Sequence, residues 1–155
     1  MEYVNLDAQV GELSGVLDPS RYLERLSSIS GDLPSGARSF ATHTGHYDFH
    51  SRRCVKDLTL RAVRGLGGKE IEVDFQHNCW KHDRDLAIRY VGVSSFVIDP
   101  AGEDRGTDLG AVVLDEILPH PDGCSHEIAF RDGTLTVVSR DLQAAWTEAD
   151  CSSES

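Results

Sequence analysis

The spacing of apolar residues changes from a helical period near the start of the chain to a strand period over the rest. Apolar residues between Tyr22 and Ile29 recur at intervals of three and four, which predicts a helix with one apolar face. Asp18 can cap this helix, Pro19 suits its first position, and Gly31 is expected to end it.

Other segments near the start are less regular. Residues 6–17 fit either a strand or a short helix. Residues 34–36 contain a proline and a glycine, so we expect an irregular segment there.

From residue 46 onward apolar and polar residues alternate, which is typical of strands with one buried face. Runs that predict strands cover residues 46–50, 58–63, 71–75, 86–90 and 111–118. A glycine-rich loop joins the second run to the third, which predicts a hairpin. Gly92 is expected to mark a bulge or a bend in the fourth strand.

The last hairpin can be predicted in more detail, because Asp132-Gly133 is a pair favoured in two-residue type I′ turns. With this pair at the tip, Phe130 faces Leu135, and the next apolar pair along the two strands falls on the same face. Residues 142–146 suggest a short closing helix, or an edge segment that caps the sheet.

Together these elements predict one α+β domain over residues 1–149, followed by a frayed polar tail at 150–155. The one clear helix lies outside the series of strands, which argues against alternating βαβ units. We expect a curved antiparallel sheet of five to seven strands, or a partly closed barrel, with an N-terminal helix packed on it. Residues 99–110 are expected to form a polar surface loop.

The chain is acidic, with 15 Lys and Arg against 26 Asp and Glu and a net charge of −11. This charge disfavours nucleic acid and anionic lipid as partners and favours a basic protein, although solubility alone also accounts for it. We expect no signal peptide, and no stretch is apolar for long enough to cross a bilayer. The four cysteines lack C-x-x-C spacing, so we expect a cytoplasmic protein with reduced thiols.

The most chemically suggestive segment is HTGHYDFHSRRC, residues 43–54. Imidazole nitrogens and a carboxylate suit zinc or another divalent metal. On a strand His46, Asp48 and His50 would share one face at intervals of about 6.5 to 7 Å, which permits a metal site with His43 as a further ligand. A solvated polar face gives the same pattern, so we expect no cofactor and keep the metal site as an alternative.

Asp115 and Glu116, with His120 and Glu127 beyond them, could serve as general acids and bases. A solvated strand end followed by a turn fits the same residues. The nucleophile motifs G-x-S-x-G and S-x-x-K and the zinc motif H-E-x-x-H are absent from the sequence. The sequence therefore favours a protein without catalytic residues over an enzyme.

Four segments between residues 55 and 142 have a familiar pattern: VKDLTL, DLAIRYVGVSSFVI, LDEILPHPDGCSHEIAFRDGTLTV and RDL. In outline they resemble small uncharacterised bacterial proteins of the polymorphic-toxin immunity type. The resemblance implies a non-catalytic cytoplasmic protein that binds a protein partner, such as a toxin.

The leading hypothesis is therefore an immunity-like protein that binds and neutralises or regulates a basic partner through an acidic surface. Its candidate contact residues are Asp115, Glu116, His120 and Glu127. One alternative is a metal-dependent enzyme or metal-binding regulator centred on residues 43–50. A second alternative is a small-ligand carrier with a pocket between the sheet and the helix. The sequence does not predict an oligomeric state.

Overall fold

A computed structural model describes residues 1–100 and 108–149. In chain order the elements are β1 (Asn5–Val10), β2 (Leu13–Asp18), α1 (Ser20–Ile29), the 3₁₀ turn η1 (Ser30–Asp32), α2 (Ser35–Ala41), β3 (Thr59–Gly67), β4 (Glu70–Gln76), β5 (Arg84–Pro100), β6 (Val112–His120), β7 (Gly123–Phe130) and β8 (Gly133–Glu148). The expected tail at 150–155, and most of the expected surface loop, lie outside the described residues.

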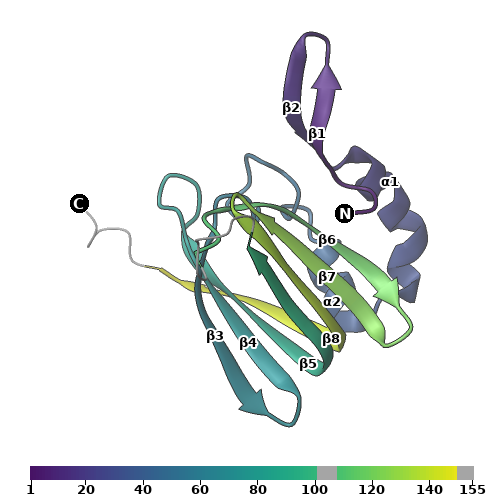
Figure 1. Cartoon of the computed structure of the whole chain (residues 1–155), viewed down its shortest axis with the longest axis vertical. Helices are drawn as coiled ribbons and strands as arrows, with labels where there is room; N and C mark the ends of the chain where they lie inside the picture. Colours follow the sequence, from purple (N-terminus) through teal and green to yellow (C-terminus); the bar gives the residue numbers. More distant parts are fainter. Residues whose placement is uncertain (101–107, 150–155) are drawn as a thin grey trace.

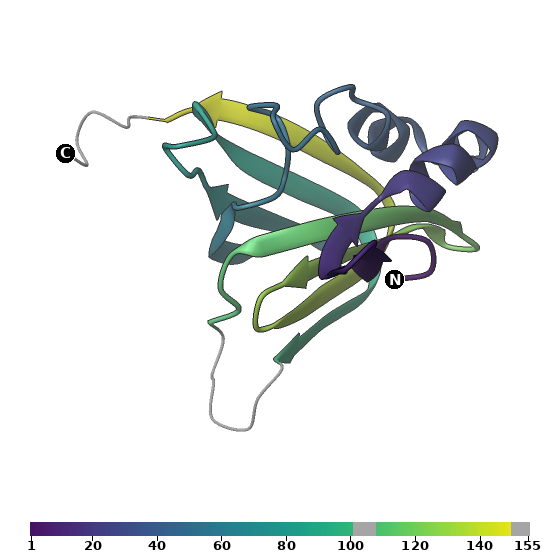
Figure 2. The same cartoon turned by 90° about the horizontal axis from the view of Figure 1, so that it is seen from above.

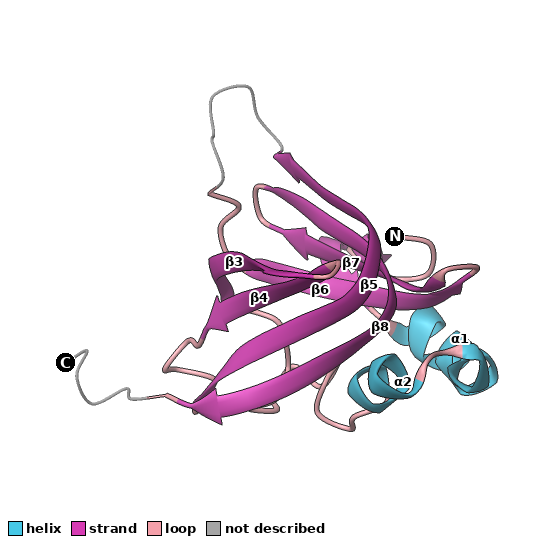
Figure 3. Cartoon of the chain, turned by 90° about the horizontal axis from the view of Figure 1, so that it is seen from below, coloured by secondary structure: helices cyan, strands magenta, loops and turns pink. Residues whose placement is uncertain are grey.

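The fold is the expected α+β class with an antiparallel sheet. Six strands form one sheet in the order β3-β4-β5-β8-β7-β6, and β1 and β2 form a separate two-stranded sheet (Figure 1). The large sheet is strongly curved around the long pair β5 and β8 (Figure 3). It is not closed into a barrel. Thr59 at the start of β3 forms an isolated bridge with Ala111, the residue before β6.

The expected helix is confirmed over Ser20–Ile29, but Pro19 rather than Asp18 is its N-cap residue, and Gly31 lies in the 3₁₀ turn that follows it. The Asp18 carboxylate accepts the Ser20 N–H at 2.9 Å. Helix α2, not this helix, makes the more extensive contact with the large sheet. Helix α2 packs on β8, whereas α1 contacts β6. Both helices lie beside the same part of the sheet (Figure 3). The undecided residues 6–17 form most of the β1–β2 hairpin, with Gly11 at φ +61 in its turn.

Helix α2 replaces the irregular segment expected around Pro34 and Gly36. Proline is tolerated here because it precedes the first helical turn. A Cβ on Gly36 would lie 1.9 Å from the carbonyl oxygen of Leu142, so glycine allows the helix to approach β8 closely. The Asp141 carboxylate accepts the N–H groups of Gly36 at 3.2 Å and Ala37 at 3.0 Å. Contact with the sheet therefore selects a helix that the local sequence disfavours.

The β7–β8 hairpin forms, but its predicted register is wrong by two residues. Gly133 pairs with Phe130, so residues 131–132 form the tip. Gly133 also pairs with Pro100, and a Cβ there would lie 2.6 Å from the carbonyl oxygen of Asp99. Close approach of β5 therefore requires glycine inside the strand. An offset of two keeps each side chain on its predicted face.

The closing helix predicted as one possibility for residues 142–146 is wrong. These residues continue a central strand, in which Leu142 pairs with Tyr90 of β5, and no closing helix forms there. The β3–β4 hairpin is confirmed. Gly92 is confirmed as an irregularity, since its φ is +63 and the β5–β8 register shifts just beyond it.

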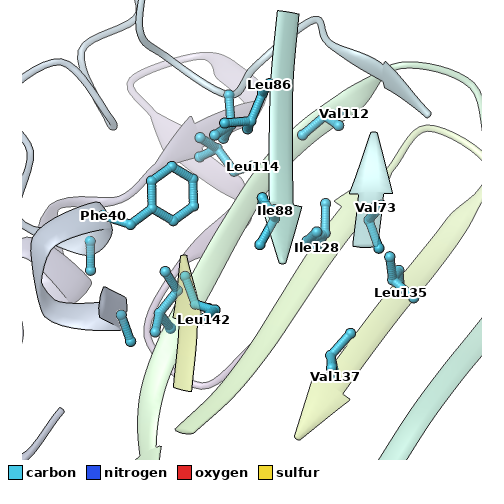
Figure 4. Close-up of a cluster of buried hydrophobic side chains, with 14 of the residues drawn as sticks. Phe40, Val73, Leu86, Ile88, Val112, Leu114, Ile128, Leu135, Val137 and Leu142 are labelled. Carbon is cyan, nitrogen blue, oxygen red and sulfur yellow. The ribbon is translucent and has the colours of Figure 1, made fainter. Parts of the chain in front are cut away.

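The hydrophobic core lies between the curved sheet and the layer made by α1, α2 and residues 42–58. Its largest fully buried side chains are Tyr22, Tyr90, Phe75, Leu33, Leu58, Leu86, Ile88, Leu109, Leu114, Ile117, Leu135 and Leu142. Figure 4 shows Phe40 of α2 turned toward side chains of the sheet, among them Ile88 and Leu142. The N-terminal residues run along β6 (Figure 2), and Val4 among them is buried in the core.

Candidate functional site

A buried polar network is centred on Asp115 of β6. The Nε2 atoms of His46 and His126 each lie 2.7 Å from one of its carboxylate oxygens. The second nitrogen of His46, Nδ1, lies 2.9 Å from the carbonyl oxygen of Phe40. The Nδ1 of His126 lies 2.7 Å from the hydroxyl of Tyr90. Asp115, His46 and His126 are each only 1 % exposed, so the network is inside the core.

These partners determine where the protons lie. Burial alone would raise the pKa of Asp115, but the charge and hydrogen bonds of the two histidines outweigh it and hold that pKa well below its ordinary value. The ionised carboxylate and the Phe40 carbonyl both accept, so both ring nitrogens of His46 are placed to donate. Nε2 of His126 faces the carboxylate, and its Nδ1 faces the Tyr90 hydroxyl. The network is thus a buried ionised carboxylate held between two histidine rings.

The hydroxyl groups of two further tyrosines form hydrogen bonds with the backbone of the same stretch of β6. The Tyr47 hydroxyl donates to the carbonyl oxygen of Asp115 at 3.0 Å. The Tyr22 hydroxyl donates to the carbonyl oxygen of Ile117 at 2.6 Å and accepts its N–H at 3.2 Å. Burial raises the pKa of both tyrosines, which keeps them neutral donors. Side chains from α1 and from residues 42–58 are therefore locked onto one edge strand.

The network is not arranged for acid–base catalysis. A general base needs a nitrogen or oxygen that can reach the substrate, and all four ring nitrogens of His46 and His126 already have protein partners. A pocket of about 240 Å³ adjoins His46 and is lined also by Phe40, His43, Arg53 and Trp146. His46 contributes to the wall of this pocket without offering it a free nitrogen, which indicates a structural role.

The candidate metal ligands do not share a face, because residues 46–50 form turns and the predicted strand is wrong. Turn hydrogen bonds run from the His46 N–H to the carbonyl of His43 at 3.0 Å and from the Ser51 N–H to the carbonyl of Asp48 at 2.8 Å. His43, Asp48 and His50 are exposed while His46 is buried. Within residues 1–100 and 108–149 no group of three or more His, Cys, Asp or Glu side chains is placed to hold a metal.

Two of the four candidate partner-binding residues lie in the interior. Asp115 forms the network, and the carboxylate of Glu116 accepts the backbone N–H groups of residues 2–4 at 2.7 to 2.8 Å. Both side chains are buried, so in this fold neither presents a surface to a partner. Glu127 is half-buried beside Glu116, and His120 is exposed at the β6–β7 turn.

The structure instead exposes large apolar side chains that sequence reasoning did not single out. Val10 and Leu13 at the tip of the β1–β2 hairpin are 58 % and 68 % exposed, and Trp80 is 99 % exposed. Residues 6–17 could not be assigned from their spacing, and nothing in the sequence distinguishes an exposed tryptophan from a buried one. These residues are the strongest surface candidates for binding.

Comparison with protein-family profiles, with curated proteins and with solved structures finds no match for the chain. Among the described residues neither helix combines the length and apolar content needed to cross a bilayer.

Proposed function

We propose that this chain is a non-catalytic binding protein, and that the β1–β2 hairpin is its contact element for a basic partner protein. The observation that carries the proposal is the hairpin itself, which projects from the body as a separate two-stranded sheet (Figure 1). Two-stranded hairpins are marginally stable in water on their own. A hairpin that projects with apolar residues at its tip is therefore suited to being covered by another molecule.

The chemistry of the hairpin indicates what kind of molecule would cover it. Residues 9–15 are all exposed, while Leu6 and Leu17 at the base pack against the core. From Asn5 to Asp18 the charged residues are Asp7, Glu12 and Asp18, with no Lys or Arg. A basic surface with an apolar centre complements this hairpin, and the net charge of −11 would speed the encounter.

The resemblance of residues 55–142 to immunity proteins suggests a more specific form of this proposal. The basic partner would then be a toxin, and binding would neutralise it. Co-expression with a toxic product of a neighbouring gene tests this form directly. Protection that is lost when Leu13 is changed to Ser supports it, and an absence of any toxic neighbour contradicts it.

The general proposal can be tested by site-specific photo-crosslinking in the source cells. A photoreactive residue replaces Leu13, and the matched control replaces Leu66, which is 43 % exposed at the end of the β3–β4 hairpin. We expect one dominant adduct to a basic protein at position 13 and none at position 66. Equal adducts at both positions, or none at either, would contradict the proposal.

The identified pair then allows a quantitative test. Truncation of a central apolar contact typically costs about 2 kcal/mol, so Leu13→Ser should weaken binding about 30-fold. Glu12→Lys should lower the association rate and its dependence on salt. Binding that is unchanged in both variants would exclude the hairpin as the contact element.

A further inference from the structure

A tight turn after β4 displays Trp80 fully to solvent. The Asn78 side chain accepts the Trp80 N–H at 3.0 Å, and the Asn78 carbonyl accepts the Lys81 N–H at 2.9 Å. Buried His82 fixes the turn from below, since its Nδ1 accepts the Asn78 N–H at 3.0 Å and its Nε2 donates to the carbonyl of Cys54 at 2.7 Å. The exposed indole is therefore held outward by an ordered turn.

A groove of about 610 Å³ lies beside this indole, and we call it the Trp80 groove. Its lining includes Trp80, Phe49, Arg52, Lys56, Lys81 and Asp57. These residues supply three cations against one carboxylate, in a chain whose net charge is −11.

Asp57 organises the cations of the Trp80 groove. Its carboxylate lies 3.1 Å from the ammonium of Lys56 and 3.5 Å from that of Lys81. Its backbone has φ +77, a left-handed conformation that is costly for a residue other than glycine and is often kept at binding sites. The guanidinium of Arg52 lies 3.6 Å from the carboxylate of Asp83, and the Arg52 side chain is 73 % exposed. The groove thus combines the apolar face of Trp80 with a local excess of positively charged side chains.

We propose that the Trp80 groove of one copy binds the β1–β2 hairpin of a second copy. The hairpin carries three carboxylates and no cation, and the groove carries three cations and one carboxylate, so their charges are complementary. Exposed Val10 and Leu13 would pack on the indole of Trp80. The contact joins different surfaces, so two copies either exchange both hairpins and close as a pair or continue as a chain.

This inference rests on the hairpin being a docking element, as the proposed function does. A basic partner protein would then compete with self-association for the same hairpin. The net charge of each copy opposes association, but at 0.15 M salt charges are screened beyond about 8 Å, so the contact charges dominate. At 0.01 M salt the screening length is about 30 Å, and repulsion between whole molecules should weaken association.

Analytical ultracentrifugation of the full chain from 1 to 500 µM in 0.15 M salt tests the inference. We expect association of the wild-type protein, and at least tenfold weaker association of Trp80→Ser and of Leu13→Ser. Leu66→Ser is the matched control, because it removes an exposed apolar residue from another hairpin and should leave association unchanged. A wild-type protein that stays monomeric, or a Trp80→Ser variant that associates normally, would overturn the inference.

Mixing the two variants provides a sharper test. Trp80→Ser keeps an intact hairpin and Leu13→Ser keeps an intact groove, so an equimolar mixture should form pairs with one copy of each. Neither variant should pair to the same extent alone. A mixture that associates no more than its components contradicts a contact between hairpin and groove.

Two further outcomes separate this inference from its alternatives. An acidic peptide or a single-stranded oligonucleotide that changes the fluorescence of Trp80 while the wild-type protein stays monomeric assigns the groove to another ligand and overturns the inference. The proposed function survives that result, because crosslinking of Leu13 to a basic partner does not require the groove. Trp80→Ser should bind such a partner as well as the wild-type protein does.

Discussion

Removal of the Asp115 carboxylate should be among the most damaging changes to this fold. Asp115→Ala deletes the acceptor for His46 and His126 and leaves two buried Nε2 atoms without a partner. Each buried unsatisfied group costs about 1–3 kcal/mol, and breaking a buried ion pair from one side costs about 3–5 kcal/mol. We therefore expect a loss of about 4 kcal/mol, or a fall in Tm of about 8–16 °C for a chain of this length.

Asp115→Asn should cost much less, which separates the hydrogen bonds from the charge. The amide oxygen can accept from His126, and the amide nitrogen can donate to Nε2 of a neutral His46 that still donates to Phe40. Every buried polar atom of the network then keeps a partner. We expect a loss of about 1–2 kcal/mol, close to the difference between a charged and a neutral hydrogen bond.

Urea denaturation followed by circular dichroism measures both losses. Asp122→Asn is the matched control, since Asp122 is exposed in the β6–β7 turn, and its effect should stay below about 0.5 kcal/mol. The reasoning is refuted if Asp115→Ala lies within 1 kcal/mol of the wild-type protein, or if the alanine and asparagine variants are equally destabilised.

The pH dependence follows from the lowered pKa of Asp115. A carboxyl whose pKa is lower in the folded state stabilises the protein above its unfolded pKa of about 3.9, and this contribution is lost as the pH falls through the folded value. The unfolding free energy of the wild-type protein should therefore fall between about pH 5 and pH 3, as measured by urea denaturation at each pH. An unfolding free energy that stays constant over that range would show that Asp115 does not titrate as its contacts indicate.

Three other changes test separate parts of the fold by denaturant unfolding. Gly36→Ala should cost about 3 kcal/mol or more, because its Cβ would lie 1.9 Å from the carbonyl oxygen of Leu142, although the same change stabilises most helices. Lys69→Gly should stabilise by about 1 kcal/mol, because Lys69 has φ +63 and an exposed side chain, whereas Lys69→Ala should not. Glu116→Gln should cost about 1–2 kcal/mol and speed amide hydrogen exchange at residues 2–4, and unchanged exchange there would contradict the contact.

The strands that could be predicted from sequence are those whose pattern is local. Alternation in residues 86–90 places every second side chain on one face whatever the rest of the chain does, and Leu86, Ile88 and Tyr90 are indeed buried. Residues 46–50 alternate just as well and form turns. Alternation there was misleading because a long-range contact of His46 with Asp115, invisible in the local pattern, selects the turn.

Long-range packing also explains why the acidic pair is buried although its sequence pattern indicates a surface position. Asp115 and Glu116 point to opposite faces of β6, and an edge strand usually leaves one face to solvent. Here the histidines cover one face and the backbone of residues 2–4 covers the other. His126 lies 11 positions from Asp115, but His46 lies 69 positions away, and Tyr3 and Val4 lie 113 and 112 positions from Glu116. No spacing rule connects these distant groups.

The buried network and the exposed groove are parts of one structural unit. His46 and Tyr47 are the anchors of residues 42–58, and the same segment supplies Lys56 and Asp57 to the Trp80 groove. A buried ion pair contributes little net stability compared with apolar packing but can fix one conformation of the chain around it. Asp115→Asn should therefore loosen the groove before it unfolds the protein, and weaken self-association at temperatures where the circular dichroism spectrum is unchanged. If association is as strong as in the wild-type protein, the network stabilises the core alone and the groove is held by its own contacts.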